Sequence, residues 1–364
     1  MKNMGAKIVR RIKKYIVNKQ YLRLLPKPPV EVLASDWPEF YNKGKGKKVL
    51  YLAAKYDYGD KSKGISYEEY NFFYTLKNMN NIEVVRLDIY SIFLRYGKNI
   101  ANKVIKEVAL LEGVDSIILL LFQDIFDHEM FKDLSDNFEM ETIIWLFDDD
   151  KRYLETESLV KCFNKVVTTI ELRHQARISQ GINSQLAQFA ANHFLYKDYG
   201  MQKEYDVVFV GQNFGNRQEY IDYLQNHGIA VKAFGYGWPG TGRLTQVEMI
   251  ELLNKAKISL NFSSSDGNPE LKFLKGRVFE IPATGSMLLT EDCEDLDKFF
   301  EKRKHVDTFI DKNSLLEKVS YYLSNQEKLK YISESGKRLV LNKYTFELYL
   351  CDILDVRNEK KNYL

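Results

Sequence analysis

Apolar runs of strand length alternate with helical or polar stretches along most of the chain, and the pattern occurs twice. In the first half, the runs begin at Val49, Ile82, Ser116, Thr142 and Val166. Strands that alternate with helices form βαβ units and pair in parallel, and strands covered on both faces read as continuous apolar runs. The first half therefore predicts a parallel α/β sheet.

The pattern loses its period between Ala190 and Lys203 and restarts at Tyr205. Further strand-like runs begin at Ile229, Ile258 and Met287. A chain of 364 residues is long enough for two domains with separate cores. We therefore predict a basic segment and linker over 1–46, an N-terminal α/β domain over 47–200 and a C-terminal one over 201–344.

The first 27 residues carry nine Lys or Arg and no acid. Apolar residues recur among them at the helical spacing of Ile8, Val9, Ile12 and Ile16, which is typical of a basic amphipathic helix. Such a helix contacts an anionic membrane surface or packs on the protein as an ordinary solvated helix, and the pattern allows both. Linker-like residues follow, so the folded domain is expected to start near Lys47.

The most informative stretch runs from Ser263 to Gly285. Asn268 suits an N-cap and Pro269 the first turn of a helix, which is predicted to end at Gly285. The apolar stripe of this predicted helix consists of Leu271, Leu274, Val278 and Ile281. One face of the helix is therefore expected to pack, which leaves another for a ligand.

The beginning of this predicted helix has the features of a phosphate site. Unpaired backbone N–H groups from Ser263 to Gly267 and the positive end of the helix dipole suit an anion. Lys275 and Arg277 add cations, and Glu280 suits the hydroxyl groups of a ribose. Alternatively, Arg277 and Glu280 form an ordinary surface ion pair, and the residues alone leave both interpretations open.

The segment Lys275 to Gly285, with Leu288 to Glu291 after it, resembles the signature of the glycosyl transferases group 1, in the branch of the spore-maturation-type enzymes. The resemblance implies the GT-B fold, in which two Rossmann-like domains with parallel sheets face a central cleft. In that fold the C-terminal domain holds most of a nucleotide sugar. The resemblance also implies that the last segment, 345–364, is a helix that crosses back to the N-terminal domain.

The motif from Gly235 to Gly240 reads G-x-G-x-x-G, but it is not a dinucleotide fingerprint. Pro239 stands inside it, and the evident N-cap of the next helix is Thr245, well beyond the glycines. The resemblance implies that three residues of the motif line the nucleotide instead: Tyr236, Gly237 and Trp238. Alternatively, the aromatic residues only cover the edge of the sheet.

Gly211 ends the first strand of the second domain, and Arg217 begins the helix after it. A glycine turn permits a ligand to approach the backbone, and an arginine at this point binds phosphate in a bidentate manner. The resemblance associates both residues with the donor diphosphate.

Asp148, Asp149 and Asp150 follow a strand of the first domain. Such carboxylates suit Mg²⁺ or Mn²⁺. The resembled GT-B enzymes bind the diphosphate through cationic side chains and helix dipoles without a metal, so we expect no metal site. The acids are then expected to contact acceptor hydroxyls or cap a helix, and the acceptor candidates are Asp57 and Asp149.

The chain departs from the resembled family at Lys272. Many retaining GT-B enzymes carry two glutamates eight positions apart, of which the second corresponds to Glu280 and the first to Lys272. A lysine cannot replace an acid as the acceptor of sugar hydroxyl groups. The way in which this chain holds a sugar is therefore expected to differ.

These features predict a glycosyltransferase that moves a sugar from a nucleoside diphosphate donor to a hydroxyl acceptor. The expected donor is a UDP-sugar or a GDP-sugar. The resemblance implies retention of configuration and no cofactor besides the nucleotide sugar. The predicted catalytic residues are Arg217, Lys275 and Glu280, and the predicted donor-binding residues are Gly211, Arg217, Tyr236, Gly237, Trp238, Ser264, Gly267, Lys275, Arg277 and Glu280. The alternatives are a nucleotide-sugar epimerase and a non-catalytic surface-assembly protein.

The chain carries 53 basic and 50 acidic residues, a balance that argues against a general nucleic-acid binder. Its three cysteines have no metal-ligand spacing and suit a reducing compartment. No apolar run approaches the roughly 20 residues of a membrane span. We therefore expect a cytoplasmic protein that acts in cell-surface polysaccharide or glycoconjugate synthesis. If the basic segment 1–27 contacts a membrane, it does so at the inner face, and a lipid-linked or envelope glycan is then the expected acceptor.

Overall fold

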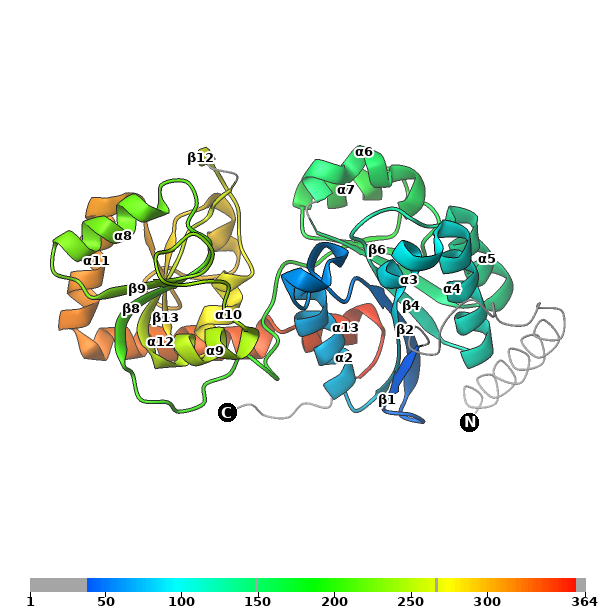
Figure 1. Ribbon diagram of the computed structural model, residues 1–364, viewed down its shortest axis with the longest axis horizontal. Coiled ribbons are helices and arrows are strands. Elements are labelled where there is room, and N and C mark those ends of the chain that lie inside the picture. The colour runs from blue at the N-terminus through cyan, green and yellow to red at the C-terminus, as the bar shows by residue number, and fades with distance from the viewer. Residues whose placement is uncertain (1–37, 148, 266–267, 358–364) are drawn as a thin grey trace. The chain divides into compact units, whose positions relative to one another are not determined.

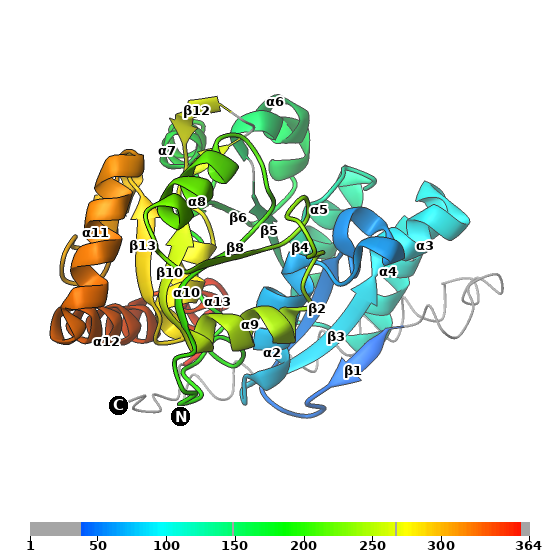
Figure 2. The same ribbon diagram turned by 60° about the vertical axis from the view of Figure 1, so that its left-hand side comes forward.

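The computed structural model describes residues 38–147, 149–265 and 268–357, which form two compact units. Within these residues, unit 1 comprises 38–188 and 349–357, and unit 2 comprises 189–348. Each unit is a parallel or mostly parallel sheet with helices packed on it (Figures 1 and 2). The predicted fold class, α/β with two parallel-sheet domains, is confirmed. The basic segment 1–27 lies outside the described residues.

The sheet of unit 1 has seven strands in the order β1-β3-β2-β4-β5-β6-β7. All neighbouring strands run parallel except β1, which is antiparallel to β3. The strands are β1 (Glu39–Tyr41), β2 (Lys47–Ala53), β3 (Ile82–Asp88), β4 (Ser116–Leu120), β5 (Glu141–Leu146), β6 (Lys165–Thr168) and β7 (Ser184–Leu186). Strand β1 lies in the stretch that we predicted as linker, so the folded unit begins before Lys47.

The helices of unit 1 bury a large apolar core against this sheet. Leu50, Ile117 and Ile144, from three neighbouring strands, share one cluster with residues of the helices that cover them, such as Ile105 and Phe131. The helical elements are the short turns η2 (Asp57–Gly59), η3 (Lys61–Lys63) and η4 (Glu69–Phe73), then α2 (Tyr74–Asn78), α3 (Ile89–Tyr96), α4 (Lys98–Glu112), α5 (His128–Phe138), α6 (Asp149–Val160) and α7 (Glu171–Ser179).

The sheet of unit 2 has five parallel strands in the order β14-β13-β10-β8-β9. These strands are β8 (Tyr205–Val210), β9 (Val231–Phe234), β10 (Ala256–Asn261), β13 (Met287–Glu291) and β14 (Asp307–Phe309). A separate hairpin pairs β11 (Ser264–Ser265) with β12 (Asn268–Lys272). Figure 2 shows this hairpin projecting from the sheet beyond the end of β10.

Two apolar clusters, one containing Leu288 and the other Leu289, lie on opposite faces of β13 in unit 2. Successive side chains of a strand point to opposite faces, so helices cover both sides of this sheet. The helices are α8 (Arg217–Asn226), α9 (Gln246–Lys255), α10 (Arg277–Ala283), the turn η5 (Glu294–Lys298), α11 (Lys312–Ser324) and α12 (Gln326–Lys343). The predicted N-cap Thr245 is confirmed at the start of α9, where it forms a capping box with Glu248.

The last described helix, α13 (Phe346–Ile353), belongs to both units. Its residues up to Leu348 group with unit 2, and those from Tyr349 group with unit 1. Lys47 and Lys165 of unit 1 donate to the carbonyl oxygens of Leu354 and Ile353 over 2.8 and 2.6 Å, which fixes the helix end to this unit. Across the described ranges, no helix combines the length and the apolar character that crossing a membrane requires.

Candidate functional site

The carboxyl ends of β8 and β10 mark the point in unit 2 where the strand order reverses. β8 comes first along the chain, and its neighbours in the sheet are β9 on one side and β10 on the other. In open α/β sheets, ligands bind beside the carboxyl ends of the strands at such a point. The segments 211–217 and 262–264, which leave these two ends, therefore belong to the candidate site.

The turn after β8 is bonded to the turn after β9. The N–H of Gly211 donates to the carbonyl oxygen of Phe234 over 2.9 Å, and the N–H of Asn213 to that of Tyr236 over 2.8 Å. Gly235 has a φ of +132°, and a Cβ on it would lie 2.4 Å from the carbonyl oxygen of Gly211. This glycine is therefore required by the close contact between the two turns, and no ligand needs to be invoked for it.

Trp238 is a core residue, whereas Tyr236 is 72% exposed. The indole N–H of Trp238 donates to the carbonyl oxygen of Gly211 over 2.8 Å, and its ring meets that of Phe209 edge to face at 5.9 Å between centroids. The expectation that Trp238 flanks a nucleotide is corrected by this burial, because its ring and its single donor are already used. Tyr236 remains a candidate for that role.

Arg217 is the first residue of α8, and its guanidinium lies at the carboxyl end of β8. Nη1 donates to the carbonyl oxygen of Gln212 over 2.9 Å, and the guanidinium carbon lies 5.6 and 5.8 Å from the ring centroids of Phe209 and Phe262. Nε is buried and has no hydrogen-bond partner among the described residues. Burial lowers the pKa of Arg217, and the nearby charge of Glu291 partly offsets this effect. A buried cationic donor without an acceptor favours an anionic ligand.

Glu291 ends β13 and binds the loop that leaves β10. Its Oε2 accepts the backbone N–H groups of Ser263 and Ser264 over 3.0 and 3.1 Å. The prediction that these N–H groups are unpaired is therefore wrong, since a carboxylate of the chain already accepts them. The sequence did hold a signal for this role, because an acid directly follows the strand-like run that begins at Met287.

Residues 268–272 form the strand β12, so the predicted helix start at Asn268 and Pro269 is wrong. The chain pairs antiparallel with β11, and the N–H of Phe273 donates to the carbonyl oxygen of Ser263 over 3.0 Å. This hairpin pairing outweighs the local capping preference of Asn268. Gly267 lies outside the described residues.

The helix of this stretch is α10, and it is shorter than predicted. It begins at Arg277, ends at Ala283 and is followed by Gly285 at a φ of +74°. Of the predicted stripe, three residues have described side chains, and all are buried: Leu274, Val278 and Ile281. Lys275 lies in the turn before α10, with its Nζ 5.6 Å from the ring centroid of Phe273.

Arg277 forms an ion pair with Glu280 through Nη1 and Oε2. Glu280 is fully buried, so the pair is not the solvated one that we gave as an alternative. Burial and the charge of Glu280 raise the pKa of Tyr196 far above its usual value. Oε2 of Glu280 orients the guanidinium of Arg277, whereas Oε1 is buried without a hydrogen-bond partner among the described residues. The expectation that Glu280 receives ribose hydroxyls therefore stays a prediction.

Asp149 in unit 1 is not available to an acceptor. It is 1% exposed, and its carboxylate forms an ion pair with the buried Arg177, with Nη2 donating to Oδ1 over 2.8 Å. The hydroxyl of Thr168 donates to Oδ2 over 2.6 Å. The expectation that Asp149 orients an acceptor is therefore wrong, because its acceptor oxygens hold β6 and α7 to the start of α6. Asp148 and the side chain of Asp150 lie outside the described part.

Asp57, the other acceptor candidate, lies in η2, within the loop that follows β2. It is half-buried, and its N–H donates to the carbonyl oxygen of Gly64 over 3.0 Å, which closes this loop. Its place beyond the carboxyl end of a parallel strand suits a ligand-binding residue. Within the described ranges, no three His, Cys, Asp or Glu residues gather as a metal site.

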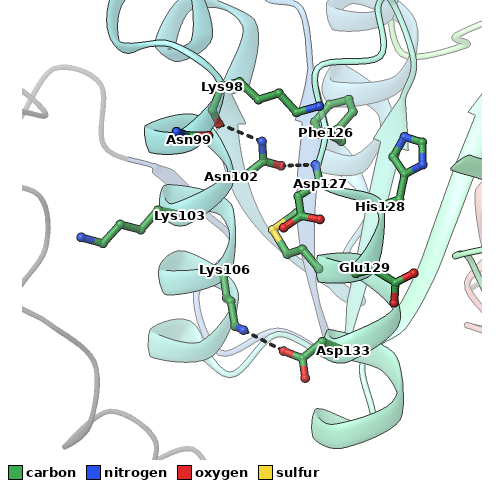
Figure 3. A pocket seen from close by; sticks show the side chains of 11 residues that line it. Lys98, Asn99, Asn102, Lys103, Lys106, Phe126, Asp127, His128, Glu129 and Asp133 are labelled. Atoms are coloured by element: carbon green, nitrogen blue, oxygen red, sulfur yellow. Dashed lines mark hydrogen bonds and ion pairs between the residues drawn. The ribbon is translucent and has the colours of Figure 1, made fainter.

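A groove of about 920 Å³ lies between α4 and α5 of unit 1 (Figure 3). Asn102 joins its walls, since its amide donates to the carbonyl oxygen of Lys98 over 2.8 Å and accepts the N–H of Asp127 over 2.8 Å. Lys106 forms an ion pair with Asp133 over 2.7 Å. The groove has three lysines and three carboxylates, so it has no excess charge to attract a ligand of either sign.

The comparison with protein families gives one match, and most of the matched residues lie in unit 2. Residues 217–355 match the family model described as glycosyl transferase-like, and the match begins at Arg217. It includes Lys272, Arg277 and Glu291 of the candidate site. A sequence search of curated proteins finds no match.

Solved structures share the fold of most of this chain at low identity. Sucrose-phosphate synthase from Thermosynechococcus elongatus has a TM-score of 0.58 at 10% identity, over 85% of this chain and 98% of that chain. HepE from Anabaena, solved in complex with UDP-glucose, has a TM-score of 0.54 at 10% identity, over 85% and 99%. A putative UDP-N-acetylglucosamine 2-epimerase from Listeria monocytogenes has a TM-score of 0.52 at 9% identity, over 88% of this chain and 100% of that chain.

At these identities the structural likeness shows the fold alone, and the glycosyl transferase-like match adds the family of the segment that carries the candidate site. Together, the match over residues 217–355 and the two-unit fold support a glycosyltransferase enzyme.

Proposed function

We propose that the chain transfers a sugar from a nucleoside diphosphate donor to a hydroxyl acceptor, with the donor on unit 2 and the acceptor on unit 1. Arg217 carries the proposal. Its guanidinium lies at the point where the strand order reverses, close to two aromatic rings, and its buried Nε lacks a partner among the described residues. A diphosphate oxygen supplies the acceptor that this donor lacks.

The negative charge of the buried Glu291 is stabilised by groups other than Arg217. Lys272 lies 3.3 Å from Glu291, and the two N–H groups of Ser263 and Ser264 also stabilise that carboxylate. Arg217 therefore stays available to a second anion. Lys275 and Arg277 extend the basic character of the segment that leads into α10.

In the proposed reaction the bond between the anomeric carbon and the diphosphate oxygen breaks, and a bond to the acceptor oxygen forms. The acceptor proton passes to the departing diphosphate, so no protein base is required, and the configuration is retained. Negative charge grows on the diphosphate during this step. Arg217 and Lys275 thus stabilise the transition state more than the bound donor, which is the condition for catalysis.

Three finer features belong to the same proposal. A UDP-sugar is the proposed donor, supported by the fold shared with HepE, which was solved with UDP-glucose. The proposed setting is cell-surface polysaccharide synthesis on the cytoplasmic face of a membrane, contacted through the basic segment 1–27. The proposed reaction uses no metal, since cationic side chains bind the diphosphate.

The test is a thermal-shift and turnover screen of UDP-, GDP- and dTDP-sugars on the full chain, on Arg217→Ala and on Arg338→Ala. Arg338 is an exposed arginine of α12 in the same unit and serves as the matched control. We expect one nucleotide to stabilise the wild type. Loss of Arg217 should weaken its affinity roughly 10- to 100-fold, the value of a charge-assisted hydrogen bond, and Arg338→Ala should bind like the wild type.

Turnover with and without added acceptor separates the proposal from the alternatives. Donor consumption that needs a hydroxyl acceptor supports transfer. Conversion of the nucleotide sugar without any acceptor would identify an epimerase, a class that shares this fold. Absence of nucleotide binding in all arms would refute the proposal and favour a non-catalytic protein.

A further inference from the structure

A second cavity of unit 1, of about 620 Å³, lies at the carboxyl ends of β2 and β3. Lys55 follows β2, Asp88 ends β3, and Ser91 and Arg95 of α3 form another part of the wall. Ligands of parallel α/β sheets bind beside such strand ends, and a volume of this size suits a small organic molecule. The cavity therefore has the position and size of a ligand site.

Basic residues outnumber acidic ones in the wall of this cavity. The wall contains four basic residues and two acidic ones, namely Lys55, Lys61, Arg86 and Arg95 against Glu39 and Asp88. The whole chain has 53 basic and 50 acidic residues, so the excess is a local property of this site. A concave wall of one prevailing sign attracts ligands of the opposite sign.

Asp88 is bound within the protein. Its Oδ1 accepts the N–H groups of Lys55 and Ser91 over 3.3 and 3.4 Å, and its Oδ2 accepts the hydroxyl of Ser91 over 2.6 Å. It is thereby the N-cap of α3, where the positive end of the helix stabilises its charge. The repulsion that Asp88 exerts on an anion in the cavity is reduced accordingly.

Glu39 is likewise bound within the protein. Arg86 donates to it through Nη1 over 2.6 Å, and the hydroxyl of Tyr41 donates to its other oxygen. Burial alone would raise the pKa of Glu39, but Tyr41 and the charge of Arg86 outweigh it, and the pKa is lowered. The second partner of Arg86 is Glu69, whose Oε2 lies 2.8 Å from Nη2. Arg86 is therefore a structural residue of the wall.

Lys55 and Lys61 remain for a ligand. Lys61 forms no ion pair with any described residue and lies in η3, on the exposed loop after β2. The Nζ of Lys55 is 3.8 Å from Glu39, too far for a hydrogen bond, and its side chain is 32% exposed. Each ammonium group has three donors on a flexible stem, so both lysines can turn toward one anion.

We propose that this cavity binds the phosphate group of a phosphorylated acceptor, with Lys55 and Lys61 as its ligands. A phosphate monoester carries close to two negative charges at neutral pH and three acceptor oxygens, so it uses two ammonium groups better than a carboxylate does. The role as acceptor rests on the proposed transfer function. The affinity for phosphate does not, because every residue that carries it belongs to unit 1.

The test is a calorimetric titration of glycerol 3-phosphate, with glycerol as the uncharged reference, into the full chain. Every protein in this titration, including the parent, carries Arg217→Ala. This substitution removes a cation of the proposed donor site that would also bind phosphate. Lys55→Ala with Lys61→Ala should weaken the affinity at least tenfold. The matched control is Lys98→Ala with Lys103→Ala in the groove between α4 and α5, where charges balance; Figure 3 shows Lys103 pointing away from α5. It should change the affinity less than twofold.

Vesicles of phosphatidylcholine with and without phosphatidate form the second arm, because a lipid headgroup offers the same phosphate chemistry. If binding to phosphatidate vesicles depends on Lys55 and Lys61, the phosphate belongs to a lipid-linked acceptor. If only the binding of glycerol 3-phosphate depends on these lysines, the phosphate belongs to a free acceptor. Equal affinities in the paired variant, its control and the parent for both probes overturn the proposal. Nucleotide-sugar turnover is measured separately. If the proposed transfer function is wrong, the phosphate-binding results can therefore still be interpreted.

Discussion

The ammonium group of Lys272 lies 3.3 Å from Oε1 of Glu291, a carboxylate whose side chain is only 4% exposed. Many of the resembled retaining enzymes carry an acid where this chain has Lys272, and an acid here would face Glu291 as a second negative charge. The replacement of an acid by a lysine at this position is thus accommodated locally, because Lys272 neutralises Glu291, the carboxylate that binds the loop after β10.

This pair predicts an ordered series of variants. Lys272→Met should lower the free energy of local opening around β10 and β13 by about 1–2 kcal/mol, since Glu291 keeps its two N–H donors and loses only the cation. Lys272→Glu should lower it further, because two adjacent carboxylates repel each other. Hydrogen exchange of peptides from these strands measures both effects. Equal protection in Lys272→Met and Lys272→Glu would contradict the prediction.

Asp149 and Arg177 predict a large loss of stability in unit 1. Asp149→Ala leaves the guanidinium of Arg177 buried without its counter-charge, and such a break costs about 3–5 kcal/mol. The double variant Asp149→Ala with Arg177→Met removes both charges and should recover much of that loss. Urea unfolding followed by far-UV circular dichroism measures both. A double variant no more stable than Asp149→Ala would show that the pairing is not the cause.

Most strands of both sheets could be predicted because a strand covered on both faces is a continuous apolar run, which is a local signal, whereas the short β1 was assigned to the linker. The predicted strand that begins at Ile82 is β3 (Ile82–Asp88), and the one that begins at Ser116 is β4 (Ser116–Leu120). Each of these elements is a run of neighbouring residues whose apolar pattern decides its state. Tertiary partners only fix where the element ends.

The candidate site was predicted less well because its bonds join distant residues. Glu291 lies 28 positions after Ser263, and the same number separates Asp149 from Arg177, so no spacing rule shows either pair. Asn268 and Pro269 have the composition of a helix start, yet pairing with β11 decides their state. Arg217 was predicted from its place after a strand, a local feature, and is the predicted residue whose surroundings best suit its proposed role.

Gly235 predicts a test of the contact between the two turns of unit 2. Alanine at this position would need a φ of +132° and would place its Cβ 2.4 Å from the carbonyl oxygen of Gly211. Gly235→Ala should therefore destabilise unit 2 by at least about 2 kcal/mol. Gly242→Ala is the control, because a Cβ there meets no atom within 4 Å and its φ is not positive. Similar thermal unfolding of the two variants would refute the argument.

Glu69 predicts a pH dependence in unit 1. Burial raises the pKa of its carboxyl to about 7, against the opposing charge of Arg86, from 4.5 in an unfolded chain. The folded state therefore binds this proton more tightly than the unfolded state, and the contribution of Glu69 to the free energy of unfolding falls as the pH rises from about 4.5 to 7. The expected fall is on the order of 3 kcal/mol.

Glu69→Gln keeps an acceptor for Arg86 and does not titrate, so the stability of the wild type minus that of Glu69→Gln isolates the contribution of the Glu69 proton. Urea unfolding at pH 5 and at pH 8 measures this difference, which should be larger at pH 5; a difference that stays constant or grows with pH would show that Glu69 is ionised throughout and that Arg86 outweighs its burial.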